Sequence, residues 1–251
     1  MNIALYLILL GGLLLFLYFL QQNIIKSFSR ISLLLFGTNK AGVYLYFLFF
    51  LPGVVFHELA HLFTASILGV PTGQLTVFPQ REKEGWTLGK VSSAETDILR
   101  SSLIGLAPMF VGVTSIIIIG TFVFGIRTPI DFSLLISKIW TDRPLWQNII
   151  LFYLILTFSN TMFLSKEDRM TIWVLPSILI IIFIAAWIIW GQELISVIQK
   201  ETELVTMIIR PLATSFSLTC LVDLVFFLFL YFITKVIRRF KNTPQFIAGM
   251  N

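Results

Sequence analysis

Long apolar runs, each close to the thickness of a lipid bilayer, dominate the sequence. A transmembrane helix needs about 20 consecutive, mostly apolar residues. Six runs approach or exceed that length, at residues 3–20, 41–69, 98–124, 145–164, 170–190 and 212–235. Only 12% of the residues are charged, against about 25% in soluble domains, so the polar side chains are too few to cover a surface in water. The sequence therefore predicts an all-α polytopic membrane protein with about six transmembrane helices.

The first run lacks the features of a cleaved secretory signal. Residues 1–2 carry no charged side chain, and Gln21 and Gln22 follow the run without a small-residue cleavage site. We expect residues 1–40 to form a retained N-terminal anchor. Residues 41–190 are then the core, and residues 191–251 the C-terminal spans and tail, of one membrane-embedded domain.

The net charge of +5 does not indicate nucleic-acid binding, because the chain has no basic stripe or aromatic-interleaved basic patch. Basic residues next to apolar runs instead set membrane orientation. Lys26, Arg30 and Lys40 favour a cytoplasmic first loop, and the basic residues at positions 235–241 favour a cytoplasmic C-terminus. Six spans cannot satisfy both preferences, so the orientation and the span count stay open.

Two polar segments interrupt the apolar runs. Residues 74–78 and 86–91 alternate with a period of about two, and Pro79 and residues 80–85 separate them as a charged turn. This pattern predicts a β-hairpin over residues 73–92. Open sheet edges are not stable in hydrocarbon, so the hairpin must lie outside the bilayer or be shielded by protein. Residues 192–210 fit an interfacial helix or a loop equally well.

The strongest chemical signal lies in the second run. His57, Glu58 and His61 form a His-Glu-Leu-Ala-His motif, and these are the only two histidines in the chain. Residues four apart share one face of a helix, so both imidazoles can bind one Zn²⁺, with Glu58 as the general base of a metalloprotease. Pro52-Gly53 divides the run and places His57 just over one turn into the following helix. A purely structural hydrogen-bonded cluster is the alternative.

Catalytic zinc usually has three protein ligands and one water. No other histidine is present and Cys220 is the only cysteine, so the third ligand should be a carboxylate. Most acidic residues lie in predicted solvated loops. Asp168, at the start of the fifth run, and Asp223, midway through the sixth, merit weight, since a lone acid within a span is costly.

These features resemble the site-2 protease family of intramembrane zinc metalloproteases. The zinc motif lies in a predicted span, as it does in that family. Residues 73–92 look like the β-hairpin that follows this span. Residues 159–168 resemble the family's Asn-x-x-Pro…Leu-Asp-Gly segment. The resemblance covers residues 54–169.

The third of these matches is partial. Asn160 and Asp168 are eight residues apart, as in the family. Phe163 stands where the family has proline, and Glu167-Asp168-Arg169 replaces Leu-Asp-Gly.

The resemblance implies a role for each matching residue. His57, His61 and Asp168 would be the zinc ligands, Glu58 the general base, and Asn160 a contact to the substrate backbone or the oxyanion. The chain would then be a single metalloprotease domain over residues 1–251. It would hydrolyse a peptide bond in or near a transmembrane segment of a membrane-protein substrate.

Other functions stay open. We expect a multi-pass protein of the cell (plasma) membrane whose partners are the lipid bilayer, a transmembrane substrate and, in a homo- or hetero-oligomer, other subunits. The main alternative is a non-catalytic subunit of a membrane complex that keeps the motif for structure. A metal or proton transporter would need more polar groups along the spans, and a zinc protease with a soluble chamber would need long hydrophilic segments.

Overall fold

The computed structural model describes residues 3–82, 85–126, 144–162 and 202–241, together with short pieces between residues 177 and 191. Its helices are α1 (Ile3–Phe36), α2 (Asn39–Ile67), α3 (Ile98–Ile117), the π-helical segment η1 (Ile118–Val123), α5 (Leu145–Thr161) and α9 (Thr202–Lys241). The strands β1 (Thr72–Thr76), β2 (Gln80–Glu82), β3 (Gly85–Thr87) and β4 (Lys90–Ser93) lie between α2 and α3.

The described residues contain four helical segments that are long and apolar enough to cross a membrane. They are Leu5–Phe36, Asn39–Ile67, Ile98–Val123 and Thr206–Lys241. The prediction of a mostly helical, multi-pass membrane protein is therefore confirmed at this level. The fourth predicted run forms the shorter α5, and most of the fifth lies outside the described residues.

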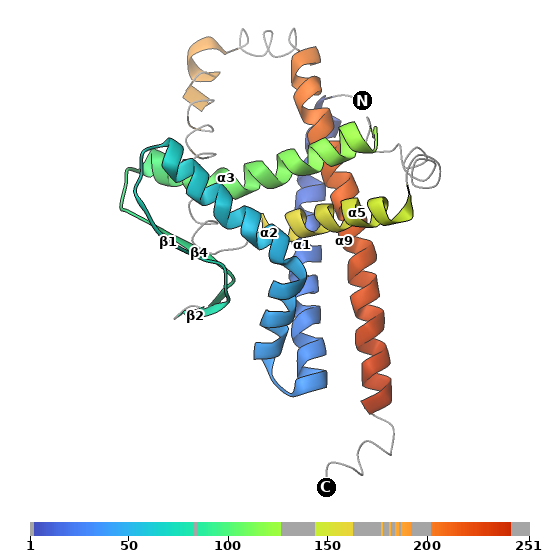
Figure 1. Cartoon of the computed structure of the whole chain (residues 1–251). Coiled ribbons are helices and arrows are strands. Elements are labelled where there is room, and N and C mark those ends of the chain that lie inside the picture. The colour runs from blue at the N-terminus through green and yellow to red at the C-terminus, as the bar shows by residue number, and fades with distance from the viewer. Residues whose placement is uncertain are drawn as a thin grey trace.

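Helices α1 and α9 lie side by side and run in the same direction (Figure 1). The Cys220 thiol of α9 donates to the Leu13 carbonyl of α1 at 3.4 Å. Further along both helices, the Phe28 and Phe226 ring centroids are 6.3 Å apart. Residues 202–210 form the first turns of α9, so this part of the segment is helical and the loop alternative was wrong there.

Helix α1 is longer than the apolar run that predicted it. Gln21 and Gln22 do not end the first helix, because α1 continues to Phe36 and includes the short apolar stretch at residues 31–36. Gln21 is buried, and its Nε2 donates to the Ser159 carbonyl at 2.6 Å, in the last turn of α5. Carbonyls in a last turn lack intrahelical donors, so a polar side chain within α1 is stabilised by a helix end inside the bundle.

Helix α2 is continuous through Pro52-Gly53, where the sequence predicted a division, and Figure 1 shows that the helix is bent along its length. Proline removes one helical donor there, and side chains of α5 supply new contacts. The Tyr153 hydroxyl donates to the Phe49 carbonyl at 2.6 Å, and the Gly53 N–H donates to Thr157 Oγ1 at 3.2 Å. A Cβ at Gly53 would lie 2.6 Å from the Thr157 carbonyl oxygen, so glycine permits the close crossing of α2 and α5.

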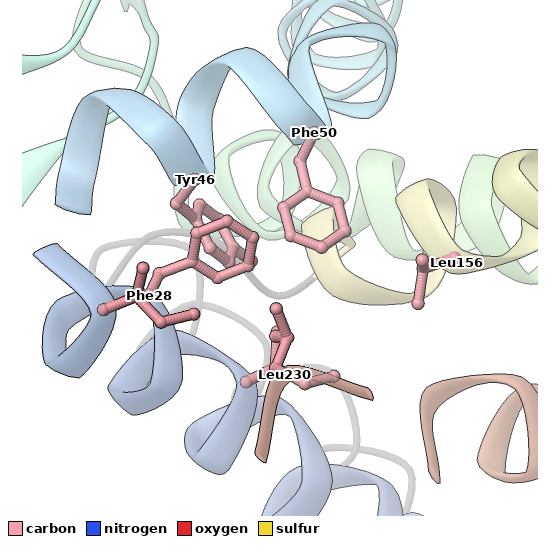
Figure 2. Packing of buried hydrophobic residues seen from close by; sticks show 7 residues of the cluster. Phe28, Tyr46, Phe50, Leu156 and Leu230 are labelled. Carbon is pink, nitrogen blue, oxygen red and sulfur yellow. The ribbon is translucent and has the colours of Figure 1, made fainter. Parts of the chain in front are cut away.

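A cluster of buried apolar residues holds the first half of α2 in place. Figure 2 shows side chains of α1, α2, α5 and α9 that gather in this cluster, which comprises Ile24, Phe28, Ile31, Tyr46, Phe50, Leu156 and Leu230. The Tyr46 and Phe50 ring centroids are 4.5 Å apart, and the Phe28 ring meets Tyr46 edge-on at 5.4 Å. Packing of this kind drives helix association in lipid, and here it fixes the helix that carries the motif.

The predicted hairpin is present and lies against α2. β1 pairs with β4 and β2 with β3, all antiparallel. Residues 80–82, predicted as part of a turn, form a strand instead, so the hairpin has two paired segments. The Tyr44 and Trp86 rings are 6.1 Å apart, and Phe47 and Phe78 are 6.0 Å apart. These two ring contacts place the hairpin against the first half of α2.

Helix α3 begins where the sequence predicted, after Asp97. The Asp97 side chain accepts a hydrogen bond from the Arg100 backbone N–H at 3.0 Å and so caps the helix. This bond is the main reason that the pKa of the exposed Asp97 carboxyl lies below its usual range.

Candidate metal centre

The two histidines of the motif face one another on α2. His57 and His61 are 4% and 9% exposed, and their Nε2 atoms are 3.2 Å apart. Two nitrogens bound to one tetrahedral zinc ion, each at about 2.0–2.1 Å, would be about 3.3 Å apart. Without a metal, the same spacing allows a hydrogen bond between the rings. The pair therefore already has the separation that a shared zinc ion requires.

The backbone of α3 fixes the orientation of the second histidine. His61 Nδ1 lies 2.8 Å from the Ile104 carbonyl oxygen. A carbonyl can only accept, so Nδ1 carries the hydrogen and the Nε2 lone pair is available to a metal. Metal-binding histidines almost always have such a partner behind the ring.

Pro108 explains why the Ile104 carbonyl is available. It lies inside α3, four residues after Ile104, and proline has no N–H to donate to that carbonyl. This contact was not predicted from the sequence. The proline within the apolar run at residues 98–124 is the only local sign of this contact. It indicates that the carbonyl four residues earlier lacks its helical donor, but it does not indicate which group binds that carbonyl.

Glu58 lies beneath the hairpin. It is 3% exposed, and a Cβ built on Gly89, between β3 and β4, would lie 2.6 Å from Glu58 Oε1. The hairpin backbone therefore contacts the carboxylate that the motif identifies as the general base. The alternating pattern predicted the hairpin but could not indicate which helical residue it would cover.

A tight C-terminal turn ends α2 soon after the motif. Gly69 has a φ of +67°, its N–H donates to the Ser66 carbonyl at 3.2 Å, and the Val70 N–H donates to the Ala65 carbonyl at 2.9 Å. Both bonds belong to the glycine-terminated Schellman motif. His57 and His61 thus lie between Pro52-Gly53 and a well-defined helix end.

A small pocket adjoins His57 where α2, α3 and α5 meet. Gly53, Phe56, Pro108, Thr161 and Met162 are among its lining residues, and water centres can occupy about 10 Å³ of it. One water molecule needs about 10–15 Å³ by this measure. The pocket as it stands therefore has room for about one water molecule, and a peptide needs the surrounding helices or the hairpin to move.

The third ligand is not located. Asp168 lies outside the described residues, so its role remains a prediction. Within the described ranges, no third His, Cys, Asp or Glu joins the two histidines in a group that could hold a metal ion. The Asp223 carboxylate, the other candidate, accepts hydrogen bonds from Ser159 and Asn160 instead.

Asn160 lies in the last turn of α5 and is buried, with 6% exposure. Its Nδ2 donates to Asp223 Oδ1 at 3.1 Å and to the Leu156 carbonyl at 3.0 Å. The main-chain carbonyl of Asn160 accepts a hydrogen bond from the Tyr46 hydroxyl at 2.9 Å. Its amide nitrogen therefore contacts α9, while the next residue, Thr161, lines the pocket beside His57.

These residues bring together two imidazole nitrogens suited to one metal ion, a neighbouring carboxylate and a water-sized space, all buried within an apolar bundle. This set can bind a soft divalent cation and accept a proton. Comparisons with protein-family models, with curated proteins and with solved structures give no significant match to the chain.

Proposed function

We propose that the chain is a zinc-dependent intramembrane endopeptidase that resembles the site-2 protease family. Its substrate would be a peptide bond in or near a transmembrane segment of another membrane protein. The observation that carries the proposal is the 3.2 Å approach of His57 Nε2 and His61 Nε2 beside the buried Glu58. Ionisable residues within membrane helices are costly and usually functional, which favours this reading over a purely structural cluster.

The zinc ligands would be His57 and His61 through Nε2, with Asp168 as the proposed third. The Ile104 carbonyl supports this assignment, because it holds the hydrogen of His61 on Nδ1. Zinc, when bound, polarises the scissile carbonyl and lowers the pKa of a water molecule toward about 7.

Glu58 would transfer the proton. Its carboxylate accepts a proton from the attacking water as the water oxygen adds to the peptide carbonyl carbon. It returns that proton to the leaving nitrogen as the C–N bond breaks. The Glu58 side chain adjoins the histidines in the helix and is excluded from solvent.

The hairpin would guide the substrate. A helical segment must unwind before its carbonyls can react, because they are otherwise hydrogen-bonded within the helix. An unwound strand can add to the edge of a sheet through backbone hydrogen bonds. Gly89 brings the hairpin backbone against Glu58, so a strand paired with the hairpin would run close to the general base. Asn160 is the proposed contact to the substrate backbone or the oxyanion.

Substitution of Glu58 tests the mechanism. We expect Glu58→Gln and Glu58→Ala to keep zinc bound but to abolish cleavage of a co-expressed single-span substrate. His57→Ala and His61→Ala should lose both zinc and cleavage. Glu95→Gln, which changes an exposed carboxylate in the loop before α3, is the matched control and should cleave normally. Cleavage by Glu58→Ala would overturn the mechanism.

A non-catalytic subunit is the second candidate. The coverage of Glu58 by the Gly89 backbone favours this candidate, because a substrate cannot reach the carboxylate unless the hairpin moves. Purified protein with the motif intact but with no zinc bound after metal addition would support this alternative against the protease.

A further inference from the structure

A second buried polar cluster joins α5 to α9. Asp223 lies midway along α9 with 0% exposure. Its Oδ1 accepts hydrogen bonds from Ser159 Oγ at 2.8 Å and from Asn160 Nδ2 at 3.1 Å. The proposed hydrolysis makes no use of this carboxyl group.

Two oxygen atoms of this cluster have no hydrogen-bond partner. They are Asp223 Oδ2 and Asn160 Oδ1, both buried. In the described part of the chain, Ser159 and Asn160 are the groups that hydrogen-bond to the Asp223 carboxyl, and no cation is among the groups that act on it. Among the described residues, the Tyr46 hydroxyl and the Cys220 thiol are the titratable groups that interact with its charge, and both are neutral in their ordinary state.

One added hydrogen would satisfy both oxygens. As a carboxylate, Asp223 would carry an uncompensated charge in an apolar interior. Asp223 Oδ2 and Asn160 Oδ1 would then both be acceptors without a donor. As a neutral acid, it has one O–H to donate. The unsatisfied acceptor in the same cluster is Asn160 Oδ1, which belongs to the side chain already bound to Asp223 Oδ1.

We propose that Asp223 is a buried proton-binding site that forms a reciprocal acid–amide pair with Asn160. Asp223 Oδ2–H donates to Asn160 Oδ1, and Asn160 Nδ2–H donates to Asp223 Oδ1. This pair locks the amide in one orientation and joins α9 to the last turn of α5. Asp223 is thereby a positioning residue for the last turn of α5, in which Thr161 lines the pocket beside His57; this role in catalysis rests on the proposed function.

Infrared spectroscopy of the purified full chain tests the proton directly. We expect the carbonyl stretch of a protonated carboxylic acid in the wild type at neutral pH, lost in Asp223→Asn. The exposed Asp97→Asn variant is the matched control and should keep the band. If the wild-type minus Asp223→Asn difference spectrum contains only carboxylate bands, the proposal is overturned.

Thermal stability provides the second measurement. Asparagine at position 223 can replace the acid–amide pair by an amide–amide pair with the same two hydrogen bonds, so Asp223→Asn should keep the melting temperature. Asp223→Leu removes both of these bonds and also the bond from Ser159 Oγ, and should lower the melting temperature. The rival model is a metal ion bound by Asp223 Oδ2 and Asn160 Oδ1. In that case Asp223→Asn would be as unstable as Asp223→Leu, and the wild type would melt at a higher temperature in sodium than in a bulky organic cation. That result would overturn the neutral pair.

The positioning role has its own measurement. In the cleavage assay, Asp223→Asn should keep kcat, and Asp223→Leu should lower kcat more than it changes KM. Unchanged kcat in Asp223→Leu would overturn the positioning role and leave the proton site standing. If the wild type cleaves nothing, the proposed function fails, while the infrared band still decides whether Asp223 holds its proton.

Discussion

Gly89→Ala probes the contact between the hairpin and the proposed general base. The new Cβ would lie 2.6 Å from Glu58 Oε1, whereas ordinary van der Waals contact begins at 3.4 Å, so the carboxylate must move by about 0.8 Å. The new Cβ would also lie 2.7 Å from Glu58 Cγ and 2.8 Å from Glu58 Cδ; all three atoms belong to one side chain, which must rotate to relieve the clash. The substitution therefore displaces the proposed base itself.

The expected effect is on chemistry rather than stability. A displacement of about 1 Å in a catalytic group can reduce the rate by about 100-fold. We therefore expect kcat/KM of Gly89→Ala to fall by about 10–100-fold, which corresponds to about 1.4–2.7 kcal/mol. The assay is cleavage of a single-span substrate in proteoliposomes, with bound zinc and melting temperature measured on the same preparation. Both should match the wild type.

Gly73→Ala is the matched control in the same hairpin. Its Cβ would press on Ser92 Oγ, an exposed and flexible side-chain end that is remote from the chemistry. It should cleave at the wild-type rate. Two results would refute the reasoning: full activity of Gly89→Ala, or an equal loss in both variants, which would mean that general disturbance of the hairpin is responsible.

Three further predictions follow from single contacts. Pro108→Ala supplies a backbone N–H that competes with His61 for the Ile104 carbonyl, so zinc affinity in a metal titration should fall by about tenfold; unchanged affinity would contradict that role. Gly53→Ala should destabilise the chain by about 1–3 kcal/mol through overpacking against α5, whereas Gly11→Ala, with nothing within 4 Å, should be neutral or slightly stabilising in thermal denaturation. Because its pKa is lowered by the backbone hydrogen bond at the start of α3, ionised Asp97 stabilises the fold above the usual aspartate pKa and loses this effect as pH falls through the lowered value. The melting temperatures of the wild type and Asp97→Ala should therefore differ at neutral pH and converge in acid.

The sequence predicted the features that follow from local spacing. Two histidines four residues apart must share a helical face, and the structure brings His57 Nε2 and His61 Nε2 to 3.2 Å. The hairpin at residues 73–92 and the start of α3 after Asp97 were likewise correct, since alternation and capping are encoded within a few residues.

Features that depend on distant partners could not be predicted in this way. Gln21 looked like a membrane exit because the sequence does not reveal the Ser159 carbonyl that satisfies its side chain. The contact between the Ile104 carbonyl and His61 joins two helices through a donor that Pro108 lacks, and no local pattern encodes it. Asp168 depends on such a distant contact as well, and it lies outside the described residues.

The parallel packing of α1 and α9 bears on the orientation that the sequence left open. The turn after α1 and the C-terminal end of α9 lie at the same end of the bundle (Figure 1), so both basic segments can face the cytoplasm. Consecutive spans alternate in direction, so if α1 and α9 both cross the bilayer, their shared direction requires an odd number of crossings from α1 to α9. In Figure 1, α3 and α5 lie steeply across α1 and α9. Apolar length alone could not predict this arrangement, because length permits a helix to span the bilayer but packing against neighbouring helices decides its tilt.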